Sequence, residues 1–408
     1  MAAKLQAPRG TFDVLPADAP GRQAVEDASK RILEAAGYRR IETPMFESTE
    51  LFARGVGEAT DIVQKEMFSF EDYSLRPEGT APVCRAYMEH GMHKLPQPVK
   101  LWYLGAYFRH ERPQAGRYRQ FWQLGVEAIG SDDPAVDAET ILLLSEILDA
   151  LGARGLRLRL ASLGTADSRA AYRAELTAHL RANEERLSQE VRDRIDLNPL
   201  RAFDADHPGT REVMASAPLL LDFLSDDDHE HFEAVKALLD AAGVAYEIDP
   251  TLVRGLDYYT RTVFEYTSDA LGAQSGIGGG GRYDGLMEQL GGAPAPGMGW
   301  AAGVERMLLA SPAPPVAAPP VDLYVAYAKP EHRQAAFRLA ADARRAGHAA
   351  RLELGGRSLK GQLKQADKTG ARYVAILGDE GTSLKDMQSG EQKTVEPDTV
   401  MHHIRGGL

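Results

Sequence analysis

The chain has 408 residues, 44% of them hydrophobic and 26% charged, a composition typical of a globular protein with two or three domains. Its single cysteine, Cys84, excludes an intramolecular disulfide and a multi-cysteine zinc site, and its neighbours indicate a packed helix residue. The N-terminus has no apolar signal core, and apolar runs such as ILLLSEILDALG are too short and too polar to cross a bilayer. We therefore expect a cytoplasmic protein without membrane contact.

The net charge of −12, taken alone, argues against nucleic-acid binding, because neutralising phosphates requires local lysine and arginine. The charge is unevenly distributed. Residues 320–408 hold 14 Lys and Arg against 11 Asp and Glu, or +3, whereas the other 319 residues hold 33 against 48, or −15. This mildly basic C-terminal part is compatible with an RNA-contacting domain or with chance.

From the N-terminus, the pattern predicts a helix over about 19–36, followed by the segment RRIETPMF at 39–46. Several short runs joined by tight turns then have strand character: 67–72, 99–111, 118–130 and 258–267. Neighbouring strands without helices between them indicate an antiparallel sheet.

The remaining segments predict how the chain is divided. A stretch from about 163 to 224 is rich in Ala, Arg, Glu and Leu and has helical spacing, so we interpret it as a helical insertion. Five prolines within 311–320 predict an extended linker. Beyond it, alternating strands and helices indicate a small α/β domain with a mostly parallel sheet. The expected domains are 1–310, which includes the insertion, and 321–408.

The most informative segment is FRHERPQAGRYRQFWQLGVE at 108–127. Four arginines around a Pro-Gln-Ala-Gly turn supply charge suited to phosphates: Arg109, Arg112, Arg117 and Arg119. In the strand that follows, side chains alternate. One face is apolar (Trp122, Leu124, Val126, Ala128) and the other carries Gln123, Gly125 and Glu127. The segment predicts a site for a small polar molecule beside a polyphosphate or nucleic acid.

Two further motifs have both a structural and a functional interpretation. RPEGT at 76–80 opens a helix over 80–91, where Thr80 is a good N-cap and Glu78 can bind an ammonium group. GMGWAAGVERMLL at 297–309 predicts a helix with Gly299, Gly303 and Arg306 on one face. That face leaves room for a planar or phosphate group, or for tight helix packing.

Other motifs exclude common sites. GIGGGG at 276–281 formally matches a dinucleotide fingerprint but lacks the acidic residue about twenty positions on, so we interpret it as a glycine-rich floor. No G-x-x-x-x-G-K-[ST] occurs, which excludes a P-loop. The histidine pairs 90/93 and 402/403 have no carboxylate or cysteine at ligand spacing and favour surface histidines over a metal site.

The motifs RGTFDVLP, RRIETPMFE, RPEGT, FRHERPQAGRYRQF, LVRGLDYYTRTVFE, GGGGRYDGL and GMGWAAGVER occur in this order. Together they resemble the histidyl-tRNA synthetase family of class II aminoacyl-tRNA synthetases over essentially the whole chain. The resemblance implies an α+β fold: a six-stranded antiparallel sheet flanked by helices, a helical insertion, and a separate C-terminal α/β domain that binds the anticodon stem. It also implies a homodimer formed through RRIETPMFE. Trp122 and Trp300 stand where the family often has histidine and phenylalanine.

The activity implied by the resemblance is ATP-dependent ligation of L-histidine to tRNA(His) through histidyl-adenylate. ATP with Mg²⁺ is the expected substrate complex, with no prosthetic group and no protein metal site. By motif position, Arg109 and Arg254 are the expected catalytic residues, and Gln114 meets the tRNA acceptor end. The implied ATP-binding residues are Arg109, Glu111, Arg117 and Arg306. The implied histidine-binding residues are Glu78, Thr80, Gln123, Glu127, Arg254, Tyr258, Tyr259 and Tyr283.

Two other functions fit parts of this pattern. The first is the non-catalytic regulatory subunit of ATP phosphoribosyltransferase, which keeps the fold and binds histidine as a sensor. That subunit usually lacks the C-terminal domain, whereas this chain has residues 321–408. This chain also has all three of Arg109, Arg254 and Arg306. A class II ligase for another amino acid is opposed by LVRGLDYYT.

Overall fold

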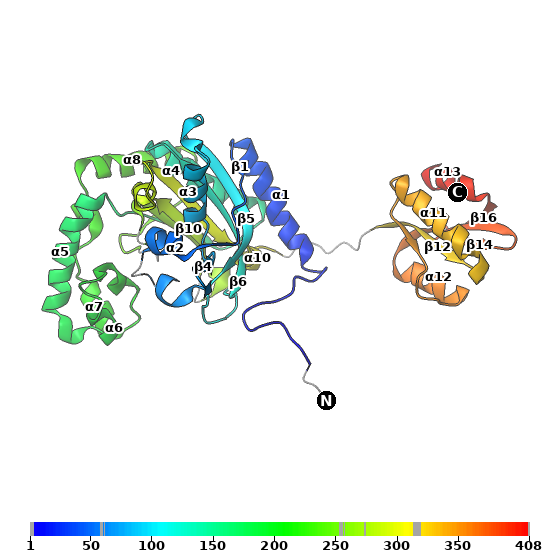
Figure 1. Cartoon of the computed structure of the whole chain (residues 1–408), viewed down its shortest axis with the longest axis horizontal. Helices are drawn as coiled ribbons and strands as arrows, with labels where there is room; N and C mark the ends of the chain where they lie inside the picture. Colours follow the sequence, from blue (N-terminus) through cyan, green and yellow to red (C-terminus); the bar gives the residue numbers. More distant parts are fainter. Residues whose placement is uncertain are drawn as a thin grey trace. The chain divides into compact units, whose positions relative to one another are not determined.

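The computed structural model describes residues 4–57, 60, 62–252, 256, 258–272, 275–312 and 320–406. The chain forms two compact units, Met1–Pro314 and Pro315–Leu408 (Figure 1). Most of the linker expected at 311–320 lies outside the described residues. Among those described, no helix is both long and apolar enough to cross a membrane.

The first unit is built on an eight-stranded sheet in the order β1-β5-β6-β11-β10-β9-β7-β8. Its six inner strands pair antiparallel, as the resemblance implies, and the two-residue strands β1 and β8 pair parallel at the edges. The strands are β1 (Arg39–Arg40), β5 (Val99–Phe108), β6 (Gln120–Ile129), β7 (Leu156–Ser162), β8 (Glu247–Ile248), β9 (Thr260–Ser268), β10 (Gly276–Arg282) and β11 (Gly297–Gly303).

Helices cover both faces of this sheet. Against one face pack α1 (Ala19–Ala35), α4 (Pro134–Ala150), α8 (Asp226–Ala241) and α10 (Val304–Ala310). Against the other face pack α3 (Thr80–Glu89) and α9 (Leu286–Gln289), and Cys84 is buried there, as predicted for a packed helix residue. Alternation along each strand thus separates a large apolar core from a face that carries polar groups.

The segment predicted as a helix over 297–309 is a strand followed by a helix. β11 ends at Gly303 and α10 begins at Val304, so the predicted face of Gly299, Gly303 and Arg306 is wrong. The physical reason is close packing with β10. A Cβ on Gly280 would lie 1.9 Å from the carbonyl oxygen of Gly299, so two glycine strands pair where side chains do not fit.

A small sheet in the order β2-β4-β3 lies outside the large one. Its strands are β2 (Phe46–Ser48), β3 (Ser69–Phe70) and β4 (Tyr73–Leu75), and α2 (Thr49–Val56) follows β2. The strand predicted over 67–72 is therefore the first half of a hairpin and not part of the large sheet.

Between β7 and α8 the chain is helical, with α5 (Ala166–Ala182), α6 (Gln189–Arg192) and α7 (Pro208–Met214). These helices gather away from α1 (Figure 1) around their own core, which includes Tyr172, Leu176, Leu180 and Val213.

The second unit has a five-stranded sheet in the order β13-β12-β14-β15-β16. Its elements are β12 (Val321–Tyr327), α11 (Arg333–Arg345), β13 (Ala350–Leu352), α12 (Leu359–Lys368), β14 (Ala371–Gly378), β15 (Gly381–Asp386), β16 (Gln392–Val395) and α13 (Val400–Gly406). β12 pairs parallel with β13 and β14, as expected. The mostly parallel sheet that was predicted is nevertheless wrong, because β15 and β16 add two antiparallel pairs.

Candidate active site

A cleft of about 350 Å³ opens on the sheet face opposite α1 and α4. Gln123 of β6, Glu265 of β9 and Ala301 of β11 line it, while their neighbours Leu124, Phe264 and Ala302 belong to the apolar core behind the sheet. Further lining comes from the hairpin that joins β5 to β6, from the 78–80 turn, and from Tyr258 and Tyr259.

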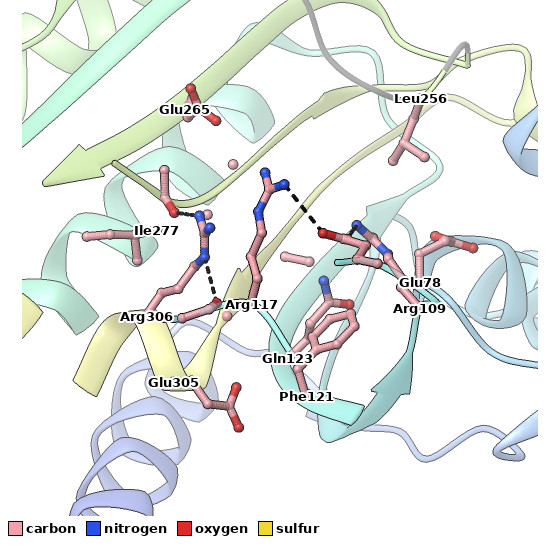
Figure 2. Close-up of a pocket in the computed structure, with 18 of the residues that line it drawn as sticks. Glu78, Arg109, Arg117, Phe121, Gln123, Leu256, Glu265, Ile277, Glu305 and Arg306 are labelled. Carbon is pink, nitrogen blue, oxygen red and sulfur yellow. Dashed lines mark hydrogen bonds and ion pairs between the residues drawn. The ribbon is translucent and has the colours of Figure 1, made fainter. Parts of the chain in front are cut away.

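Three arginines extend into the cleft from two parts of the chain: Arg109 and Arg117 from the hairpin and Arg306 from α10 (Figure 2). Arg306 is fixed, because its guanidinium donates to the carbonyl oxygen of Gly116 at 3.1 Å and to that of Gly276. Burial lowers the pKa of Arg306, and the charges of Arg117 and Arg109 lower it further. Clustered guanidinium groups of this kind favour an anionic ligand.

Glu111 lies between two of these arginines. Its carboxylate is 3.7 Å from Nη1 of Arg109 and 3.4 Å from Nη1 of Arg117. Arg109 also donates from Nε to the carbonyl oxygen of Pro77 at 2.9 Å, which links the hairpin to the 78–80 turn. The hairpin tip is closed by backbone hydrogen bonds between Gln114 and Arg117, and Gln114 itself is exposed and does not line the cleft.

The start of α3 differs from the prediction. Gly79, not Thr80, is the N-cap residue, and the carboxylate of Glu78 accepts from the N–H groups of Thr80 at 2.7 Å and Ala81 at 3.0 Å. Thr80 is the first helical residue, and its hydroxyl donates to Oε1 of Glu127 at 2.8 Å. Burial raises the pKa of Glu78 even though the two N–H groups and Arg109 oppose that shift. The Glu78 carboxylate faces the cleft, and the hydroxyl is turned toward β6.

The predicted alternation of β6 is confirmed from Gln123 onward, whereas Trp122, predicted on the apolar face, is exposed beside Arg22 of α1. Leu124, Val126 and Ala128 lie in the apolar core, and Gln123 lines the cleft. The Oε1 atom of Gln123 is buried and has no hydrogen-bond partner among the described residues. Such an acceptor is costly to leave unpaired, so it favours a ligand that donates a hydrogen bond there.

Glu127 lies one layer below the cleft and is completely buried. Besides Thr80, it accepts from the hydroxyl of Tyr103 at 3.1 Å and, on Oε2, from the hydroxyl of Tyr283 at 2.5 Å. Burial raises the pKa of Glu127 to about 8, although the hydrogen bonds from Tyr283 and Thr80 act in the opposite direction. Three hydroxyl groups therefore surround a carboxyl group that titrates near neutral pH.

The titration of Glu127 predicts how stability changes with pH. Folded chain holds this proton up to about pH 8, whereas an unfolded glutamate releases it near 4.5. The contribution of this protonated carboxyl group to the free energy of unfolding is complete below the unfolded pKa, and it is lost as pH rises through the folded pKa. Between these values the free energy of unfolding of the wild type should fall relative to that of Glu127→Gln, by at most about 1.4 kcal/mol per pH unit. Urea unfolding of both proteins across this pH range measures the difference, and parallel profiles would contradict it.

Two glycines leave space for the buried side chains of Tyr103 and Glu127. A Cβ on Gly125 would lie 2.3 Å from the ring of Tyr103, and one on Gly299 would lie 1.9 Å from Oε2 of Glu127. Gly299→Ala should therefore lower the free energy of unfolding by about 3 kcal/mol. Gly303→Ala on the same strand is a matched control, because its nearest atom is Cδ of Arg306 at 3.4 Å. Equal stability of the two variants in urea would show that Glu127 is not held as described.

An aromatic cluster forms the next part of the site. The rings of Tyr258 and Tyr259 are 4.8 Å apart and those of Tyr258 and Tyr283 5.9 Å. Burial raises the pKa of Tyr258 and of Tyr283, which keeps both hydroxyl groups protonated. Tyr258 and Tyr259 line the cleft, and Tyr283 reaches Glu127 behind it. Arg254 lies outside the described residues.

Two carboxylates in the cleft were missed. Glu305 accepts from the N–H of Trp122 at 3.1 Å and pairs with Arg22 of α1 at 2.5 Å. Glu265 lies on β9, with Nη1 of Arg159 3.2 Å away. A signal for Glu265 was present, since it is the one acid in the predicted strand YYTRTVFEYT. No comparable signal distinguished Glu305, which directly precedes Arg306 in the sequence.

The comparisons with known proteins agree over the full length. A family model described as histidyl-tRNA synthetase matches residues 10–307, and one described as anticodon binding domain matches 322–406. A histidine–tRNA ligase of Corynebacterium jeikeium is 50% identical over 405 residues, with 96% of this chain and 91% of the relative covered. One from Halothermothrix orenii is 46% identical over 401 residues, with 95% of this chain and 96% of the relative covered. The solved structure of apo histidyl-tRNA synthetase from S. aureus is 35% identical with a TM-score of 0.81, covering 98% of this chain and 100% of that one. The chain therefore belongs to the histidyl-tRNA synthetase family.

Proposed function

We propose that the chain ligates L-histidine to tRNA(His) in two steps. The carboxylate of histidine attacks the α-phosphate of ATP to form histidyl-adenylate and pyrophosphate, and a ribose hydroxyl of the terminal tRNA adenosine then takes the histidyl group and releases AMP. The observation that carries the proposal is an arginine-lined cleft directly above a buried carboxyl group, Glu127, that three hydroxyl groups surround.

The arginines fit the ATP side of this reaction. Negative charge builds up on the phosphates in the transition state, and guanidinium groups that are already fixed stabilise it without reorganising. We assign Arg109 to the α-phosphate, Arg306 to the γ-phosphate region, and Arg117 with Glu111 to ATP. Mg²⁺ enters with ATP as part of the substrate. Glu111 and Glu265, both in the cleft, offer the carboxylate oxygens that this ion prefers.

The other half of the cleft fits the amino acid. Glu78 and the unpaired Oε1 of Gln123 accept from the α-ammonium group, as does the oxygen of Thr80, whose proton is donated to Glu127. Arg254 is assigned to bridge the histidine carboxylate and the α-phosphate.

The imidazole requires one acceptor and one donor. Glu127 accepts from the ring N–H, and Tyr259 bonds to the other ring nitrogen, with Tyr258 and Tyr283 enclosing the ring. An apolar side chain of similar shape would leave these buried polar groups unpaired, which is a strong basis for rejecting it.

Transfer to tRNA involves the hairpin and the second unit. The exposed tip residue Gln114 is assigned to the acceptor end, and the anticodon-binding unit at residues 321–408 to the anticodon stem. We place the reaction in the cytoplasm. Incubation with ATP, labelled histidine and tRNA(His) should give acid-precipitable histidyl-tRNA. The sensor alternative predicts histidine binding without product. The histidine–tRNA ligases that match this chain at high coverage oppose that alternative.

We also propose that the chain works as a homodimer. Four large apolar side chains are exposed on and beside the small sheet: Met45, Phe46, Phe70 and Tyr73. Three of them form a ring cluster with centroid distances of 5.7 to 6.2 Å. An exposed aromatic patch of this kind favours a protein interface, and it includes the end of RRIETPMFE.

A further inference from the structure

The first helix of the insertion contacts the amino-acid side of the cleft directly. Arg169 lies in the first turn of α5, and its Nη1 donates to the backbone carbonyl oxygen of Tyr259 at 2.7 Å. Tyr259 lines the cleft. A charged donor on a backbone acceptor is among the stronger hydrogen bonds in proteins, so this contact fixes where the Tyr259 segment lies.

A second link joins the same two parts of the chain. The buried carboxylate of Asp228, on α8, accepts on Oδ2 from the N–H of Thr165 at 2.9 Å and from the hydroxyl of Ser168 at 2.8 Å. On Oδ1 it accepts from Nε of Arg261 at 3.0 Å. The beginning of α5 and the beginning of β9 are thus held by one carboxylate.

The beginning of β9, which follows Tyr259, loses its pairing on the β10 side. Between Gly281 and Arg282 of β10, the pairing with β9 shifts from Val263 to Thr260, so two residues of β9 have no β10 partner. One of them, Arg261, has φ of +45°, a left-handed conformation that is unfavourable for a residue with a side chain. On the β7 side the backbone of Arg261 stays bonded to Leu163 and Gly164. The contacts of Arg169 and Asp228 therefore add to the β7 side in placing the tyrosines, on a stretch that β10 leaves unpaired.

We propose that Arg169 is a positioning residue for the amino-acid site, which holds the Tyr259 carbonyl and thereby couples the insertion to histidine binding. This inference rests on the proposed function of the cleft. Coupling between two parts of a protein is reciprocal. Loss of the Arg169 side chain should weaken histidine binding, and bound histidine should stabilise the first turn of α5.

The kinetic test uses the full-length chain and ATP–pyrophosphate exchange. Arg169→Ala should raise KM for histidine about tenfold, with KM for ATP and kcat changed by less than about twofold. Arg169→Lys, which keeps a charged donor, should recover most of the affinity. Arg173→Ala is the matched control, because Arg173 lies one turn further along α5 and bonds to Asp196 and Leu197 within the insertion. An unchanged KM for histidine in Arg169→Ala, or an equal rise in Arg173→Ala, would overturn the proposal.

A second measurement tests the coupling in the wild type and then in the variant. Saturating L-histidine should slow amide hydrogen exchange in the first turn of α5 in the wild type, and Arg169→Ala should abolish this protection. Histidine could leave amide hydrogen exchange in α5 unchanged in the wild type while it supports ATP–pyrophosphate exchange. That result would contradict the coupling and leave the proposed function standing. If histidine supports no pyrophosphate exchange in the wild type, the proposed function fails, and this inference fails with it.

Discussion

Arg306→Ala should lower kcat for histidine-dependent ATP–pyrophosphate exchange by about 100- to 1000-fold, the loss typical of removing one fixed group that stabilises transition-state charge. Its guanidinium is held by the carbonyl oxygens of Gly116 and Gly276 and requires no reorganisation when charge develops on the phosphates. Burial and, after it, the neighbouring charges of Arg117 and Arg109 lower the pKa of Arg306, so an anion beside it would be bound favourably. The effect should therefore appear mainly in kcat and less in KM for histidine.

Two control variants define what is being measured. Arg306→Lys keeps the charge but cannot keep the planar geometry of two carbonyl contacts, so it should retain activity between that of the wild type and Arg306→Ala. Arg112→Ala removes an exposed arginine of the β5–β6 hairpin that does not line the cleft, and it should leave pyrophosphate exchange unchanged. Wild-type kcat in a folded Arg306→Ala protein would remove Arg306 from the ATP site.

Glu127→Ala should reduce kcat/KM for histidine by about 30-fold, because leaving a buried hydrogen-bonding group of the imidazole unpaired costs about 2 kcal/mol. The loss should be confined to the amino acid and leave KM for ATP unchanged, since Glu127 lies below the cleft and away from the three arginines. Steady-state exchange with histidine and ATP varied separately measures both quantities.

The control for Glu127 is another buried carboxylate. Glu353, in the second unit, is also completely buried and accepts from the hydroxyl of Tyr324 at 2.7 Å. Glu353→Gln should leave histidine activation unchanged, which separates loss of a histidine contact from the general cost of altering a buried acid. Wild-type kcat/KM for histidine in Glu127→Ala would sink the assignment of Glu127.

The sequence was sufficient to predict the direction of side chains where only one periodicity fits the residues. In β6, alternation alone assigned Gln123 to the ligand face and Leu124 to the core, because successive side chains on a strand point to opposite faces. In β11 the same reasoning failed, since Gly299, Gly303 and Arg306 also satisfy helical spacing. Glycine carries no side chain with which to distinguish the two periods, and pairing with the glycine strand β10 decides in favour of a strand.

Tertiary contacts decided the remaining features. Residue preference favours Thr80 as the helix cap, but the backbone turn brings the carboxylate of Glu78 onto the N–H groups and frees the Thr80 hydroxyl for Glu127. The depth of Glu127 depends on Tyr103 and Tyr283, which lie 24 and 156 residues away in the chain. Separations of this size leave no trace in local sequence pattern.

The most direct test of the central claim is ATP–pyrophosphate exchange by the purified full-length chain with each of the standard amino acids in turn. The account predicts exchange that depends on L-histidine and is at least about 1000-fold slower with any other amino acid, because a site built on hydrogen bonds rejects side chains that leave them unmade. Histidine binding without exchange would contradict it in favour of a sensor, and exchange driven by a different amino acid would contradict the assignment of the polar pocket to imidazole.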